Sequence, residues 1–362
     1  MDKDELLAGT YNPGDGDDEP NMFLKSPQEA EIPKKWVDSI NAHNPNYFKS
    51  DSGTIVVWSN LEPQSWSTKK GLFDNVSQQA GRMYRYYLHG PKKPEDMGHK
   101  DIKTHGRVPR KINISLVSFK ESVPSDIEPI EVKYRDPLFL MPGADFSPDD
   151  GKFENLKGEK WDFSIEPMFN ELALSDILKT SKDDSITDPK TGPIAGELHI
   201  NCSIVKRKAR DYVKAAGNKP HGKAAQRLQG LSILRERREM DWNSSIMAPS
   251  ASGAEVYRWI GLEVDFDKGL DPIMGTTDEK QSAKHFMDAL EQVINWSQDG
   301  ESNVRKEIDG MKADYENKTG NIETDSLNFI IFYRYQIAYK VAQTITKLQN
   351  DIKARTHIEY KS

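Results

Sequence analysis

A run of basic side chains between positions 205 and 240 is the part of the sequence best suited to binding a charged partner. The run holds eleven Lys and Arg against three Asp and Glu, a local charge of +8 in a chain whose total is −7. Such an excess attracts the phosphates of a nucleic acid or the acidic face of a neighbouring subunit. The candidate nucleic-acid-binding residues are Arg207, Lys208, Arg210, Lys223 and Arg227. The alternative is a solvated charged helix and hairpin without a ligand.

Aromatic residues are scarce in this basic run, where Tyr212 stands alone among the charges. Proteins that bind single strands stack the bases on aromatic rings. The composition therefore favours contact with a phosphate backbone over stacking of unpaired bases.

Several motifs of phosphate, cofactor and metal chemistry are missing. The sequence has no Gly-x-x-x-x-Gly-Lys-Ser/Thr loop, no Gly-x-Gly-x-x-Gly turn after a strand and no His-Glu-x-x-His. The carboxylate pairs Asp149-Asp150 and Asp183-Asp184 stand in turn-like clusters, which indicates solvated loop charges. The single cysteine, Cys202, excludes an internal disulfide and a cysteine-rich metal site. We expect no metal site.

Alternating strand and helix patterns must position the basic run. Runs of β-branched residues and alternating polarity predict strands over 53–58, 112–117, 197–205, 231–235 and 259–266. Apolar spacings of three and four predict helices over 67–88, over 206–228 with a break at 217–220, from 284 onward, and over about 325–354. Because the elements lack a tight βαβ rhythm, the order predicts an α+β fold.

The last predicted helix carries a coiled-coil-like seam of apolar residues at spacings of three and four. These seam residues are Ile337, Val341, Ile345, Leu348 and Ile352. The seam has two interpretations, which the sequence leaves open. It packs on its own domain, or it pairs with another chain in a homo- or hetero-oligomer.

Length and composition set the outer limits. A chain of 362 residues is long enough for two ordinary domains or one large domain with attachments. No stretch approaches the about 20 apolar residues of a membrane span, and the acidic N-terminus lacks the apolar core of a signal peptide. These features predict a cytoplasmic protein without a membrane partner.

Three motifs, taken in order, resemble a known family. They are GTIVVWSNL at 53–61, GLSILRERREM at 230–240, and the stretch 259–281, which ends in MGTTDEKQ. With this order and spacing the chain resembles the GHKL ATPases, and more closely the bacterial and phage Hsp90-like ATP-binding proteins. The resemblance runs from about residue 53 to 297.

The resemblance implies a transducer-type β/α domain, similar to the second domain of a small-subunit ribosomal protein. In the family, this domain sends a lysine-bearing loop to the γ-phosphate of ATP bound in the preceding domain. Lys280 matches the loop's lysine and is the implied catalytic residue, with Gln281 as the implied cofactor-binding neighbour. A lysine there neutralises charge that builds up on the transferring phosphoryl group. The alternative is a solvated lysine near a helix N-terminus, where the helix dipole mildly disfavours it.

The chain departs from the family in its first half. A complete GHKL ATPase begins with a helix carrying a Glu that activates water and an Asn that binds magnesium, followed by an Asp-x-Gly-x-Gly loop and a Gly-rich lid. None of these patterns is present. Glu166 and Asn170 have the right spacing, but Pro167 lies between them and they follow the Gly-Thr-x-Val strand instead of preceding it. We therefore expect ATP and Mg only through a partner or missing ATP-binding half, and none on the chain alone.

The predicted organisation has four parts. These are an acidic, loosely ordered leader (1–52), the closing strand and connecting helix of a nucleotide domain (53–94), a transducer-like α+β domain (95–300) and a C-terminal helical extension (301–362). The predicted function is to couple the nucleotide state of an ATP-binding half or subunit to conformational change. The alternative is a non-enzymatic module that binds nucleic acid through the basic run or serves as a scaffold.

Overall fold

The computed structural model describes residues 68–90, 111–120, 123–124, 130–139, 186–194, 198–205, 220–247, 254–276 and 282–358, with positions 38, 56, 144 and 196. The strand predicted over 53–58 lies outside these residues except at Val56. The chain divides into two units, Met1–Gln64 with Val117–Pro129, and Ser65–Leu116 with Ile130–Ser362. In the first unit, β2 (Phe119–Lys120) and β3 (Val123–Pro124) form an antiparallel pair. The elements described below belong to the second unit.

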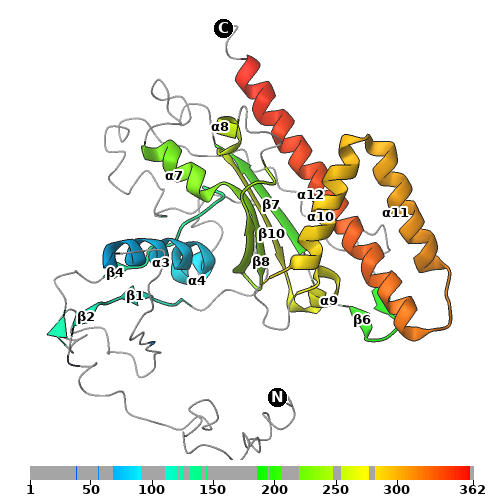
Figure 1. The fold of residues 1–362 in the computed structure, drawn as a ribbon, viewed down its shortest axis with the longest axis horizontal. Helices are drawn as coiled ribbons and strands as arrows, with labels where there is room; N and C mark the ends of the chain where they lie inside the picture. The colour runs from blue at the N-terminus through cyan, green and yellow to red at the C-terminus, as the bar shows by residue number, and fades with distance from the viewer. Residues whose placement is uncertain are drawn as a thin grey trace, which may run out of the picture. The chain divides into compact units, whose positions relative to one another are not determined.

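A four-stranded sheet is the centre of the second unit (Figure 1). Its strands in chain order are β7 (Leu198–Ile204), β8 (Gly230–Arg235), β9 (Arg238–Asn243) and β10 (Ile260–Phe266). The order in the sheet is β7-β10-β8-β9, so β10 lies between β7 and β8. β10 pairs antiparallel with β7 and parallel with β8, and β8 and β9 form an antiparallel hairpin.

Helices and two small strand pairs surround this sheet. The helices are α3 (Lys69–Met83), α4 (Arg85–His89), α7 (Pro220–Leu228), α8 (Ala254–Tyr257), the 3₁₀ helix η5 (Lys268–Leu270), α9 (Asp271–Met274), α10 (Lys284–Gln298), α11 (Glu301–Glu316) and α12 (Ile322–Ile358). The strand pairs are β1 (Ser115–Leu116) with β4 (Ile130–Glu131), and β5 (Ile186–Asp188) with β6 (Gly192–Ile194). None of the described helices is both long and apolar enough to cross a bilayer.

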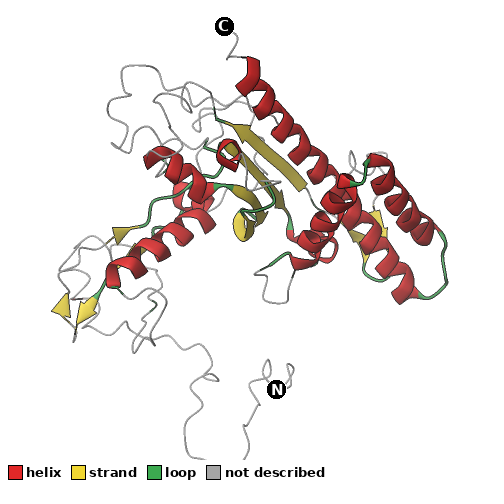
Figure 2. Cartoon of the chain, turned by 45° about the horizontal axis from the view of Figure 1, so that its top comes forward, coloured by secondary structure: helices red, strands yellow, loops and turns green. Residues whose placement is uncertain are grey.

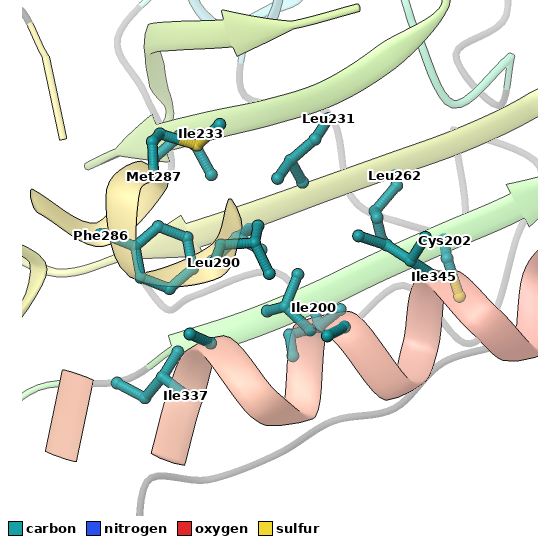
Figure 3. Packing of buried hydrophobic residues seen from close by; sticks show 14 of the residues in the cluster. Ile200, Cys202, Leu231, Ile233, Leu262, Phe286, Met287, Leu290, Ile337 and Ile345 are labelled. Atoms are coloured by element: carbon teal, nitrogen blue, oxygen red, sulfur yellow. The ribbon is translucent and has the colours of Figure 1, made fainter. Parts of the chain in front are cut away.

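One face of the sheet is apolar and packs on α10 and α12. Alternate strand residues such as Ile200, Ile233 and Leu262 point toward Phe286 of α10 and Ile345 of α12 in Figure 3. All five are at most 3% exposed, which identifies this layer as the main core. Alternation along a strand places every second side chain on the same face, so a single apolar pattern builds the whole layer.

The seam of the C-terminal helix is used within the chain. All five seam residues, Ile337, Val341, Ile345, Leu348 and Ile352, are buried in the same core as the sheet. Packing on the chain's own domain therefore accounts for the apolar spacing.

The other face of the sheet is polar and meets α3 and α4, so that helices lie on both faces (Figure 2). The segment 136–139 also covers this face, where the Ser203 hydroxyl donates to the carbonyl of Leu138. A Cβ at Gly261 would lie 2.5 Å from the carbonyl oxygen of Pro137. A side chain at position 261 would therefore push this segment off the sheet.

The turn between β8 and β9 has an uncommon backbone. Glu236 and Arg237 both have positive φ, 50° and 69°. Two-residue hairpin turns of this kind favour Asn and Gly, because bulkier residues are strained there. Three contacts compensate: Glu236 donates its N–H to the Phe266 carbonyl, its own carbonyl accepts from the Tyr87 hydroxyl, and the Arg237 N–H donates to Asp265.

The prediction of an α+β fold is confirmed. The strands predicted over 197–205, 231–235 and 259–266 match β7, β8 and β10, and α12 extends the last predicted helix at both ends. The helix predicted over 67–88 is two helices, because the chain leaves helical geometry at Tyr84. The strand predicted over 112–117 is reduced to β1. β9 and α11 were not predicted as separate elements.

Cys202 lies in the apolar layer, 1% exposed. Burial raises the pKa of its thiol to about 12. The thiol is therefore protonated and enclosed at physiological pH.

Two leucine truncations test the location of the core. Leu290 of α10 is fully buried, whereas Leu327 of α12 is 55% exposed. We expect Leu290→Ala to lower the free energy of unfolding by about 2–5 kcal/mol, because it removes a buried side chain and leaves a cavity. The matched Leu327→Ala should cost less than about 0.5 kcal/mol in the same urea titration. Equal losses for the two variants would contradict the assignment.

Candidate functional site

Five of the seven residues predicted to act on a ligand lie outside the described residues. They are Arg207, Lys208, Arg210, Lys280 and Gln281. The other two, Lys223 and Arg227, lie one turn apart on α7. Both side chains are exposed, and neither forms an ion pair with any other described residue. The structure therefore describes the flanks of the Lys280 segment and one part of the basic run.

The segment 277–281 begins at a firmly anchored helix end. Gly275 ends α9 in the left-handed conformation, with φ of 62°, and donates its N–H to the Asp271 carbonyl. A glycine adopts this conformation without the strain that a Cβ adds. Arg334 of α12 donates from Nε to the carbonyl of Ile273 at 2.7 Å. α12 thus satisfies a carbonyl group that the end of this short helix leaves open.

The segment 277–281 ends at a second anchor. The Ser282 hydroxyl donates to Oδ2 of Asp241, on β9, at 2.9 Å. Ala283 follows with no exposed surface, and its carbonyl accepts the Met287 N–H in the first turn of α10. Both ends of the predicted phosphate-binding loop are therefore fixed to the sheet and its helices.

Four buried charges join α3 and α4 to the polar face of the sheet. We call Arg82, Arg85, Glu239 and Glu263 the buried charge cluster. Arg82 Nε lies 2.7 Å from Glu239 Oε1, and Arg85 Nη1 lies 2.9 Å from Glu239 Oε2. Arg85 Nη2 lies 2.8 Å from Glu263 Oε2, and neither of these two side chains has any exposed surface. Arg85 thus bridges two carboxylates on strands β9 and β10.

Neutral side chains complete the hydrogen bonding of the cluster. Oε1 of Glu263 accepts from the Tyr86 hydroxyl at 2.6 Å and from the Asn201 amide at 2.9 Å. Arg82 donates from Nη2 to the Ser232 hydroxyl at 2.9 Å. A buried ion pair is tolerated when such partners satisfy its remaining lone pairs and protons. The cluster meets most of this condition through side chains from all four strands, and Nε of Arg85 is left without a hydrogen-bond partner among the described residues.

The surroundings shift the pKa values of Glu239, Arg85 and Tyr86 away from neutral pH. Burial by itself would raise the pKa of Glu239, but Arg82 and Arg85 hold it below its usual value. Burial opposes the charge of Arg85, yet Glu239 and Glu263 raise the pKa of its guanidinium. Burial, reinforced by Glu263, raises the pKa of the Tyr86 hydroxyl. None of these three groups is suited to proton transfer near neutral pH, so the arrangement is a mechanical joint, not an acid–base centre.

Sequence reasoning did not find the buried charge cluster. The apolar spacing that predicts the helix over 67–88 gives no sign that Arg82 and Arg85 have buried partners. One signal was present in the strand 260–266, where the carboxylates Glu263 and Asp265 alternate with large apolar residues. One face of this strand lies in the core and the other carries the acidic side chains. If the acidic face is also covered, its carboxylates need cationic partners.

Burial on this face disfavours the ionised form of Asp265. Burial raises its pKa to about 6, with Glu263 adding to the effect and Arg237 and His199 opposing it. Oδ1 accepts the Arg237 N–H at 3.2 Å, and Oδ2 lies 3.7 Å from Arg237 Nε. The pKa of Asp265 therefore lies above that of an aspartate in an unfolded peptide.

Removing the side chain of Arg85 should destabilise the packing of α3 and α4 on the sheet. In Arg85→Leu the carboxylates of Glu239 and Glu263 lose their shared buried cation, and we expect a loss of about 3–5 kcal/mol in the free energy of unfolding. The control is Arg305→Leu, which breaks a pair with Glu301 on the surface of α11. Surface pairs contribute little, so this variant should be nearly neutral. Urea unfolding followed by circular dichroism gives both values, and a neutral Arg85→Leu would contradict the role of the cluster.

Asp265 should impose a pH dependence of stability. Its pKa is higher in the folded protein than in the unfolded chain, so folding is favoured by protonation and this contribution is lost as the pH rises from about 4 to 6. Asp265→Asn removes this contribution. The stability of the variant relative to the native protein should therefore rise over this range, by up to about 3 kcal/mol. Urea titrations across that pH range measure the difference, and parallel curves would refute the assignment.

No group of three His, Cys, Asp or Glu side chains in the described part of the chain is arranged to bind a metal ion. No protein-family model, curated protein or solved structure matches the chain. The resemblance to the GHKL ATPases therefore stays a prediction from the three motifs.

Proposed function

We propose that the chain is the transducer portion of a GHKL, Hsp90-like ATPase. It would couple the nucleotide state of an ATP-binding half or partner subunit to conformational change. Lys280 would reach the γ-phosphate, and Gln281 would support the loop. ATP and Mg would be bound by the other half, so that hydrolysis requires both.

The observation that carries this proposal is that β9 has two attachments close together. Glu239 binds Arg82 and Arg85, at the junction of α3 and α4. Two residues along the same strand, Asp241 accepts from Ser282, at the end of the segment that contains Lys280. The helix that follows the Gly-Thr-x-Val motif and the lysine-bearing segment are thus fixed to one strand.

This connection is what a transducer requires. A displacement of α3 or α4 relative to the sheet would strain buried charge pairs, which tolerate little separation in a medium of low polarity. The displacement would therefore be transmitted to β9 and to the loop anchor. A loop that contacts the γ-phosphate through one lysine could in this way pass the presence or absence of that phosphate to α3 and α4. The insertion of β10 between β7 and β8, with α10 following it, also supports a transducer-type β/α unit.

An ATPase assay tests the role of Lys280. The assay combines this chain with an ATP-binding half that carries Glu-x-x-x-Asn and Asp-x-Gly-x-Gly, sought first in the adjacent reading frame. We expect Lys280→Ala to lower ATP turnover by tenfold or more, on the order of the loss seen when one group that stabilises transition-state charge is removed. Lys284→Ala is the matched control, since Lys284 is an exposed lysine in the first turn of α10. Equal effects of the two variants would count against the proposal.

The chain alone supplies the second measurement. Because the sequence lacks the Glu-x-x-x-Asn helix and the Asp-x-Gly-x-Gly loop with which the family binds Mg and adenine, titration of Mg-ATP into the isolated chain should give no binding heat. Micromolar binding would show that the chain has its own nucleotide site and would overturn the division of labour between two halves.

A further inference from the structure

Trp242 is an ordered aromatic side chain on the surface. It is the one aromatic residue among the large exposed hydrophobic residues of the described chain, 42% exposed on the edge strand β9. The Arg82 guanidinium lies over its ring, 4.2 Å from the ring centre. The indole N–H donates to the carbonyl of Gln229 at 2.8 Å. The ring is therefore fixed in position while much of it stays open to solvent.

The absence of a side chain at Gly230 leaves room for the ring. Gly230 has φ of 125°, and a Cβ at this position would lie 2.6 Å from Nε1 of Trp242. The Gln229 side chain adds a hydrogen bond to the Ser244 carbonyl, beside the strand that carries the tryptophan. A ring positioned in advance loses little conformational freedom when a flat ligand stacks on it.

The C-terminal end of α7 is next to this ring. The last residue of α7 is Leu228, whose carbonyl accepts from Arg82, the same guanidinium that lies over Trp242. Arg227 immediately precedes Leu228, and Lys223 stands one turn earlier on the exposed side of the helix. These two cations have no ion pair within the described residues. In the sequence, six further Lys and Arg lie between 206 and 219, directly before the helix.

The internal arginines of the basic run are different. Arg235 forms an ion pair with Asp271 at 2.7 Å, and Arg237 is buried beside Asp265. These two charges are used in the fold and do not attract a ligand. Lys223 and Arg227 lie instead on α7, whose last turn is close to Trp242.

We propose that Trp242, Lys223 and Arg227 form a binding surface for single-stranded nucleic acid. An unpaired base would stack on the open part of the indole ring, and the neighbouring phosphates would lie against the two cations. Every base has a flat aromatic face, so this mode of binding is tolerant of sequence. A duplex is excluded from the stacking contact because its bases are already stacked on one another. The scarcity of aromatic residues between 205 and 240 led to the opposite expectation, because Trp242 lies two positions beyond that run.

Binding of a single strand at this surface does not require the proposed ATPase role. The test uses the full chain. Fluorescence anisotropy is recorded with labelled oligothymidine and oligouridine of about 15 nucleotides, and with a duplex of the same length. The salt concentration is varied between about 50 and 200 mM. Both single strands should bind more tightly than the duplex. Trp242→Ala should weaken single-strand binding by about 5- to 100-fold without changing its salt dependence.

The charge variants separate phosphate contact from stacking. Lys223→Gln with Arg227→Gln should weaken binding and reduce the steepness of its salt dependence, because fewer counterions are released. The control pair is Lys306→Gln with Lys347→Gln, two exposed lysines on α11 and α12, which should leave affinity and salt dependence unchanged.

A second variant covers the case in which Trp242→Ala does not fold. Trp242→Phe keeps a ring over Arg82 and should retain binding intermediate between the native protein and Trp242→Ala. Oligothymidine should quench part of the tryptophan fluorescence of the native protein but not that part in Trp242→Phe. The proposal is overturned if the native chain binds no single strand at low salt. It is also overturned if the duplex binds as tightly as the single strands, or if the control pair loses as much affinity as the α7 pair.

Discussion

The second unit of the chain depends on one guanidinium, that of Arg85, placed without solvent between two carboxylates from different strands. Desolvating one such cation is expensive, and desolvating two carboxylates without it is more so. The arrangement is stable because every charge has an opposite charge at hydrogen-bond distance and because Tyr86 and Asn201 satisfy the remaining oxygen of Glu263. This requirement fixes where α4 lies on the sheet far more narrowly than apolar contact would, since apolar packing tolerates small shifts and a bridging guanidinium does not.

The same requirement explains why the two faces of the sheet differ so strongly. The face toward α10 and α12 is held mainly by shape and apolar area, with few directional contacts such as the hydrogen bond from Ser282 to Asp241. The face toward α3 and α4 is held by directional contacts between charged groups. β9 belongs to both arrangements, because Glu239 forms ion pairs in the charge cluster while Asp241 accepts a hydrogen bond from Ser282, two residues before α10. An edge strand with attachments on both faces is the natural place for one face to influence the other.

The parts of this structure that could be predicted are those in which local pattern and final environment agree. In the sequence, a strand with one face in the core appears as alternating apolar and polar residues. The C-terminal helix appears as apolar residues at spacings of three and four. β9 could not be predicted because the turn before it consists of Glu236 and Arg237, not of the glycine or asparagine that usually marks a tight hairpin. The turn depends on hydrogen bonds to residues far away in the sequence. α11 buries little besides Val304 and Ile308, so its periodicity is weak. The role of Arg85 was invisible because a basic residue in a helix reads as solvated until its distant partners are known.

The buried charge cluster also has a consequence for the order in which the chain folds. Arg85 meets Glu239 across 154 positions and Glu263 across 178, so α4 cannot be desolvated until β10 exists. Loops of this length are slow to close, and contacts between remote parts of a chain form late in folding. During synthesis the two arginines are therefore solvated cations for as long as it takes to make the whole sheet. The junction between α3, α4 and the sheet therefore cannot form before β8, β9 and β10 have all been made.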